Sequence, residues 1–207
     1  QNMARAWDEG FFDDLVTPFL SVGKDKILRP QTTMEALAKL KPVFGGSEGT
    51  MTAGNSTALT DGAAVVLVAE ESHARAQNWP VLARVVDAQV AASDYVTGNE
   101  DLLLAGARAI PELLDRNGLS LDDFALIEIH EAFASTVLAT LAALEKNGTG
   151  TVDRAKLNVN GSSLAAGHPF AATGARILAA TAKLLEEKGS GRALISICAA
   201  GGQGVTA

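Results

Sequence analysis

The stretch ALIEIHEAFASTVLATLAALEK, residues 125–146, contains a strand that leads directly into a helix. Residues 125–129 form a short apolar run of the length expected for a buried strand. Residues 131–146 are rich in strong helix formers, so a helix is expected there, and Asn147 and Gly148 end it. Strands that alternate with helices are the building units of a layered α/β sheet, so this stretch predicts the α/β class.

The same alternation continues on both sides. Further strands are expected at residues 62–69, 81–92, 157–159, 193–197 and 204–207, the last as a hairpin partner of 193–197. Helices are expected at residues 33–40, capped by Thr32 or Thr33, and at 70–78, 102–117 and 171–188. Pro18, Pro30, Pro42 and several glycines break the first 60 residues into short pieces. We therefore expect an irregular region at 1–60 and an α/β domain at 61–207.

Composition excludes several classes of protein. The 207 residues are 47% hydrophobic and 20% charged, which is typical of a globular chain. The single cysteine, Cys198, cannot form an internal disulfide or a multi-cysteine zinc cluster. A net charge of −7 gives no reason to bind nucleic acid or an anionic membrane. The apolar runs are too short to span a membrane and the N-terminus lacks a leader pattern, so a cytoplasmic location is expected.

The first candidate site residue is His130, which follows the predicted strand 125–129 and precedes the helix. Ligands bind at the carboxyl ends of strands in open α/β sheets, so this position favours a functional role. A helix N-terminus also disfavours protonation of an imidazole. The alternative is a structural histidine beside a helix cap, whose hydrogen bonds are satisfied by its neighbours.

The second candidate is His168, in the glycine-rich segment NGSSLAAGHP at residues 160–169, which FAATGAR follows. Gly167 and Pro169 constrain the backbone on both sides of this imidazole, and small residues let a ligand approach the main chain closely. The segment lacks the patterns of phosphate-binding loops. The alternative is a surface loop with an incidental histidine.

The third candidate is Cys198, in the segment CAAGGQG at residues 198–204. A thiol at the end of a buried strand, followed by a glycine turn, suits acid/base or nucleophilic chemistry, although a lone cysteine is more often a core residue. Neither the histidines nor the cysteine have the spacing of a zinc site, and His73 lies in a polar helix as a solvated residue. The pattern therefore indicates acyl or proton transfer without a metal.

Taken together, HEAFA, GHPFAATGAR and CAAGGQG resemble the signature motifs of the thiolase family, in the same order. TAGNST at residues 52–57 and LTDGA at 59–63 resemble a further family segment. The histidine of HEAFA is similar to that of the bacterial fatty-acid-oxidation 3-ketoacyl-CoA thiolases and the trifunctional-enzyme β-subunit. The resemblance implies a thiolase-like fold: a C-terminal layered α/β domain with a mixed five-stranded sheet, plus part of the loop domain.

The resemblance also implies a role for each matching residue. His168 would activate a nucleophilic thiol, His130 would hold the water that completes an oxyanion hole, and Cys198 would be the acid/base. The remaining implied contacts are the N–H of Ala200 in a second oxyanion hole, Arg29 at the coenzyme A nucleotide, Ala53 with Ser56 or Thr57 at the pantetheine, and Phe133 in the acyl pocket.

The main departure from the family pattern is that the nucleophilic cysteine of thiolases precedes these motifs, and Cys198 is the only cysteine here. A smaller departure is Gly161-Ser162-Ser163, where the family often has two glycines, and a modest local effect is expected from it. We therefore expect that the N-terminal thiolase domain is absent, that this chain alone is inactive, and that it requires an N-terminal half. The expected ligands are coenzyme A thioesters, with coenzyme A as a substrate and no cofactor or metal. A homodimer or tetramer is expected for the complete enzyme. The alternative is a non-catalytic thiolase-like module that binds coenzyme A thioesters or lipid.

Overall fold

A computed structural model describes residues 1–98 and 100–207. Its described residues form a four-stranded mixed sheet in the order β1-β4-β3-β2. The strands are β1 (Gln89–Ala92), β2 (Leu126–Ile129), β3 (Ala193–Ala199) and β4 (Gln203–Thr206). Strand β2 runs parallel to β3, whereas β4 is antiparallel to both β3 and β1. The predicted α/β class and the hairpin that joins β3 to β4 are confirmed.

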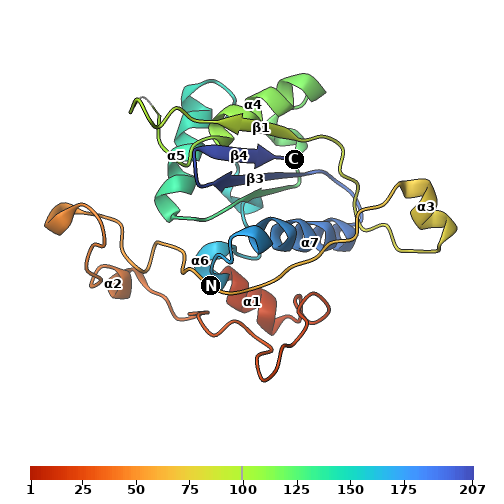
Figure 1. Ribbon diagram of the computed structural model, residues 1–207, viewed down its shortest axis with the longest axis horizontal. Coiled ribbons are helices and arrows are strands. Elements are labelled where there is room, and N and C mark those ends of the chain that lie inside the picture. Colours follow the sequence, from red (N-terminus) through yellow and green to blue (C-terminus); the bar gives the residue numbers. More distant parts are fainter. Residues whose placement is uncertain (99) are drawn as a thin grey trace.

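Helices cover both faces of this sheet (Figure 1). Alternate residues of a strand point to opposite faces, and β3 shows which helix covers which. Ser196 lies against Gly106 of α4 (Gly106–Asn117) and close to α5 (Ala134–Lys146), whereas Ile197 lies against Gly174 of α7 (Ala171–Lys188). Helix α4 ends at Gly118 because that residue adopts the left-handed conformation, with φ 62°.

The main apolar core lies between the sheet and helices α4 and α5. Its most buried side chains come from β2, β3 and these two helices: Ile110, Ile127, Leu144 and Leu194. A second, smaller core joins α1 (Asn2–Asp8) and the residues after it to α6 (Ser163–Ala166) and α7. The first 60 residues are otherwise irregular, as predicted, with one short helix, α2 (Met34–Leu37), capped by Thr33, and a single helical turn at Gly46–Glu48.

Several predicted strands are wrong, and four strands rather than five are present among the described residues. Residues 62–69 and 81–88 have no regular structure, and between them lies only the short helix α3 (Glu71–Ala76). Residues 157–159 contribute one isolated bridge, from Leu157 to Ile127. An extended run becomes a strand only when a neighbouring strand pairs with its N–H and C=O groups, and these runs lack such a neighbour in the described part of the chain. The remaining helical segments are single turns at Leu121–Asp123 and Arg154–Lys156.

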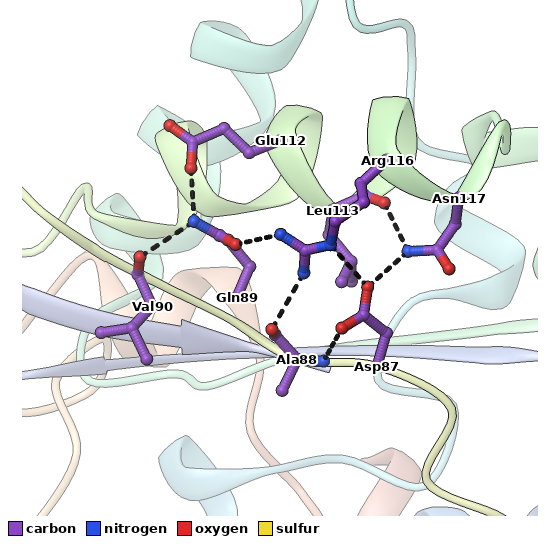
Figure 2. Close-up of polar contacts among 8 residues, drawn as sticks. All are labelled: Asp87, Ala88, Gln89, Val90, Glu112, Leu113, Arg116 and Asn117. Carbon is purple, nitrogen blue, oxygen red and sulfur yellow. Dashed lines mark hydrogen bonds and ion pairs between the residues drawn. The ribbon is translucent and has the colours of Figure 1, made fainter.

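Strand β1 is fastened to the end of helix α4 by a polar cluster (Figure 2). The Arg116 guanidinium donates hydrogen bonds to Asp87 Oδ2 at 2.8 Å, to the Ala88 carbonyl at 3.0 Å and to Gln89 Oε1 at 2.6 Å. Asn117 donates a further bond to Asp87 at 2.7 Å. These contacts hold the start of β1 in place, although residues 81–88 pair with no strand in the described part of the chain.

Candidate active site

His130 lies one residue beyond β2, at the carboxyl end of that strand. Its N–H donates to the Ser196 carbonyl at 2.9 Å, which continues the pairing with β3. On the other edge of β2, the Asn158 side chain accepts from Ile129 N–H and donates to the Ile129 carbonyl, both at 2.9 Å. Asn158 thus takes the place of a neighbouring strand. The His130 side chain is 1% exposed, so its position is fixed on all sides.

His168 lies on the turn between α6 and α7. Gly167 precedes it with φ 84°, a conformation that favours glycine, and a Cβ there would collide with Thr60. The His168 N–H donates to the Ala58 carbonyl at 2.8 Å, and Nδ1 lies 2.7 Å from Thr173 Oγ1. Backbone and ring are therefore both held.

The two imidazoles face each other, with ring centroids 4.4 Å apart. The segment at residues 52–60 joins the loops that carry them. Thr57 N–H donates to the Ala132 carbonyl at 3.0 Å, and Thr57 Oγ1 donates to the Ser163 carbonyl at 2.7 Å. The sequence motifs around 52–60, 130 and 168 therefore form one site.

Cys198 lies near the end of β3, opposite Gly204 of β4. It lines a cavity of about 10 Å³ together with His130, Thr140 and Ser196. A volume of this size is about that of one water molecule. The thiol and the first imidazole thus border the same small space.

The electrostatic environment keeps all three candidate groups uncharged at neutral pH. Burial, followed by the nearby His168 and Arg176, lowers the pKa of His130 to about 4. Burial and Arg176 also lower the pKa of His168. Burial raises the pKa of the Cys198 thiol to about 11. The site therefore offers two neutral imidazoles and a protonated thiol.

A group of buried polar residues surrounds the histidines, and the sequence motifs alone did not identify it. Glu131 accepts from Asn158 Nδ2 at 2.8 Å and from Leu164 N–H at 3.1 Å. Ser163 Oγ lies 2.9 Å from His130 Nδ1 and accepts from Arg176 Nη2 at 2.7 Å. These residues lie within or close to the two segments that carry the histidines, but each contact joins positions 13 to 33 residues apart, so no local sequence pattern identified it.

The other predicted site residues divide into two groups. Ser56 forms an isolated β-bridge with Phe133, and the ring centroids of Phe133 and Phe44 are 6.5 Å apart. Ser56, Thr57 and Phe133 therefore lie on the segments that carry the histidine site. Arg29 and Ala53 are exposed in the irregular N-terminal region. Ala200 is exposed at the turn between β3 and β4, where Gly201 and Gly202 have positive φ. Binding roles for these residues stay predictions.

The described residues contain no group of three or more histidine, cysteine, aspartate or glutamate side chains that could hold a metal ion. Within residues 1–98 and 100–207, no helix is long and apolar enough to cross a membrane.

Comparison with known protein families identifies this arrangement. The model of the thiolase C-terminal domain matches residues 79–207, and that of the thiolase N-terminal domain matches residues 1–72. The chain belongs to the thiolase family. Among curated relatives, the 3-ketoacyl-CoA thiolases of Pseudoalteromonas atlantica and Yersinia pestis are 43% and 42% identical, over 96% and 99% of this chain. These matches cover 49% and 50% of the relatives, so the chain spans about half of their length.

Solved thiolase structures share the fold. The chain superposes on human mitochondrial 3-ketoacyl-CoA thiolase with a TM-score of 0.84 at 35% identity, covering 100% of this chain and 51% of that one. Against the acetyl-CoA acetyltransferase of Bacillus anthracis, the TM-score is 0.85 at 36% identity, covering 99% and 51%. The dimeric peroxisomal thiolase of Saccharomyces cerevisiae gives 0.84 at 34% identity, covering 100% and 51%. The thiolase resemblance and thiolase-like fold predicted from the sequence are confirmed.

Proposed function

We propose that this chain is part of a 3-ketoacyl-CoA thiolase of the fatty-acid-oxidation type and supplies its acid/base and oxyanion-binding groups. The proposal rests on the arrangement of three side chains. The ring centroids of His130 and His168 are 4.4 Å apart, and His130 and Cys198 line the same cavity. The reaction is cleavage of a 3-ketoacyl-CoA by coenzyme A, or the reverse condensation. Coenzyme A is a substrate, and the chemistry requires no metal or other cofactor.

In the first half-reaction, a thiolate from a segment outside this chain attacks the C3 ketone. The C2–C3 bond then breaks, the acyl group stays on the thiol, and the departing acetyl-CoA carbanion takes a proton from Cys198. A thiol with a pKa of about 11 is protonated at neutral pH, as this step requires. His168 accepts the proton of the attacking thiol, which its lowered pKa allows because the imidazole starts neutral.

In the second half-reaction, the Cys198 thiolate removes the proton of a coenzyme A thiol. The resulting thiolate attacks the acyl thioester, the bond between the acyl group and the enzyme thiol breaks, and the shortened acyl-CoA leaves. The released enzyme thiolate takes back the proton that His168 accepted in the first half-reaction. His130 stabilises the oxyanion of these steps, directly or through a bound water, and the Ala200 N–H stabilises the oxyanion at the second site. Arg29, Ala53, Ser56 and Thr57 contact coenzyme A, and Phe133 lines the acyl pocket.

The complete enzyme is a cytoplasmic homodimer or tetramer in this proposal, and this chain requires an N-terminal thiolase half. The alternative is a thiolase-like module that binds coenzyme A thioesters or lipid without catalysis. The presence of His130, His168 and Cys198 in one site favours the enzyme, because binding alone does not need this set of acid/base groups.

A thiolysis assay tests the proposal, with the chain alone and combined with an N-terminal thiolase half. We expect turnover only in the combination. Cys198→Ser or His168→Ala should lower kcat at least about 100-fold, because each removes a proton-transfer group, while coenzyme A affinity changes little. His73→Ala is the matched control, because His73 lies on the exposed surface of α3 and should leave turnover unchanged.

Turnover by the chain alone would contradict the placement of the nucleophile outside it. Tight thioester binding by the combination without any turnover would support the binding module instead.

A further inference from the structure

Ser163 connects a cation to the first catalytic imidazole. Its Oγ accepts a hydrogen bond from Arg176 Nη2 at 2.7 Å and lies 2.9 Å from His130 Nδ1. Ser163 is fully buried and His130 is 1% exposed, so water does not compete for these bonds. The three residues come from α6, α7 and the end of β2, and their side chains form one continuous chain of contacts.

The protons in this chain can be assigned from its donors and acceptors. Arginine only donates, so the proton between Arg176 and Ser163 belongs to the guanidinium. The Ser163 hydroxyl then has one proton to donate, and His130 Nδ1 is its only acceptor among the described residues. Nδ1 therefore carries no proton, and a neutral imidazole must carry its proton on Nε2. That Nε2 is buried and has no hydrogen-bond partner among the described residues.

We propose that Ser163 and Arg176 are positioning residues of the thiolase reaction, which fix His130 in the tautomer that offers Nε2–H as a donor. The inference rests on the proposed function, because the donor serves the oxyanion of that reaction. With the opposite tautomer, Nε2 would present a lone pair and repel a developing negative charge.

Arg176 acts on both histidines. Its Nη1 donates to the Gly167 carbonyl at 3.1 Å, so the same guanidinium that orders Ser163 also holds the turn that carries His168. Its positive charge opposes protonation of both rings. Facing it are the carboxyl groups of Asp25, Glu128 and Glu131, which favour its charged form although burial lowers its pKa.

A first experiment reads the tautomer directly, by NMR of the protein labelled with ¹⁵N in its three histidines. We expect His130 Nδ1 to be unprotonated and to accept a hydrogen bond. Ser163→Ala should shift the Nδ1 signal and raise the pKa of His130, because the lost bond favoured the neutral ring. Ser162→Ala is the matched control, since its hydroxyl is also buried but has no partner among the described residues.

A proton on Nδ1 in the unmodified protein would overturn the proposal. So would an unchanged Nδ1 signal and pKa in the Ser163→Ala variant. This measurement needs no turnover, so its failure is distinguishable from a failure of the proposed function.

A second experiment separates positioning from structural support, in the combination of this chain with an N-terminal thiolase half. Ser163→Ala should lower kcat about 10- to 100-fold with KM little changed, the size typical of losing a partner that orients a catalytic group. In a His130→Asn background, the same substitution should have little further effect, because no imidazole remains to be oriented. An equal loss of kcat in both backgrounds would show that Ser163 only supports the fold, and would overturn the proposal.

Discussion

Glu128 is a carboxylic acid in the middle of a strand whose four residues are all buried. Its neighbours Ile127 and Ile129 point into the core beneath α4 and α5, so Glu128 points to the opposite face, toward α7 and Arg176. Burial raises the pKa of Glu128, nearby Glu131 raises it further and Arg176 offsets part of the effect, which together give a pKa of about 8. Near neutral pH the protein therefore keeps this carboxyl largely protonated.

This shift predicts a pH dependence of stability. Between pH 6.5 and pH 8 the unfolded carboxyl is ionised whereas the folded one still binds a proton, so stability falls as pH rises, by about 2 kcal/mol. Above pH 8 this contribution levels off. His130 does not interfere, because its lowered pKa affects stability only below about pH 6.5, and Cys198 acts only above about pH 9.

Urea denaturation at several pH values measures the effect. Glu128→Gln should weaken the decline and make the protein more stable than the unmodified chain at pH 8.5, because the amide is neutral throughout; the pKa of Glu131, which burial also raises, contributes a decline of the same sign in both proteins. Glu145→Gln serves as the control, since Glu145 is exposed on α5. Parallel curves for the unmodified protein and Glu128→Gln would show that Glu128 does not titrate in this range.

At the scale of single residues, the sequence pointed to the side chains with distinctive chemistry but not to the residues that form hydrogen bonds with them. His130, His168 and Cys198 stand at junctions between predicted elements, where their type alone draws attention. Ser163, Arg176 and Asn158 act through contacts with residues 13 to 33 positions away. Such contacts depend on how the loops fold together, which local patterns do not encode.

At the scale of elements, the outcome depended on whether each segment finds a partner. Residues 193–199 and 203–206 were predictable because a glycine turn brings them together as a hairpin. The run at 62–69 has the composition of a buried strand, yet it has no regular structure, because no strand of the described residues pairs with it. Strand β2 lies at the edge of the sheet and pairs only with β3 among the described strands. On its free edge, the Asn158 side chain forms hydrogen bonds with the N–H and C=O of Ile129 in place of a second strand.

Replacing Asn158 should therefore cost more than an ordinary loop substitution. Asn158→Ala leaves the buried N–H and C=O of Ile129 without their partners, and Glu131 loses a donor. Asn158 also has φ 46°, which asparagine tolerates better than alanine. We expect a loss of about 2 to 3 kcal/mol in the free energy of unfolding.

The comparison with Asn160→Ala sharpens this measurement, because Asn160 lies two residues further along and is only partly buried. Urea denaturation of both variants should give a clearly larger loss for Asn158→Ala. Equal losses would mean that the pairing with Ile129 contributes little to stability.

At the scale of the whole molecule, the described structure leaves strand-like apolar runs uncovered. In the run at residues 62–69, Val65 is 90% exposed and Leu67 is 77% exposed. In the run at residues 81–88, Val86 is 84% exposed. Exposed apolar surface of this extent marks an interaction site. The first run lies within residues 1–72, which match the thiolase N-terminal domain, and the chain spans about half of its relatives. If this chain combines with an N-terminal thiolase half, as proposed above, residues 62–69 are the surface we expect that half to cover.

This expectation can be tested by charging one face of that run. Val65→Lys with Leu67→Lys should leave the circular dichroism of the chain unchanged, because neither side chain packs in its core. The pair should lower the fluorescence of a dye that binds exposed apolar surface, and should prevent the chain from combining with an N-terminal thiolase half. Leu138→Lys is the matched control, since Leu138 is exposed to 51% on α5, outside the run. If the doubly charged variant combines as tightly as the control, the run at 62–69 is not the contact surface, and the exposed valines of residues 81–88 become the next segment to charge.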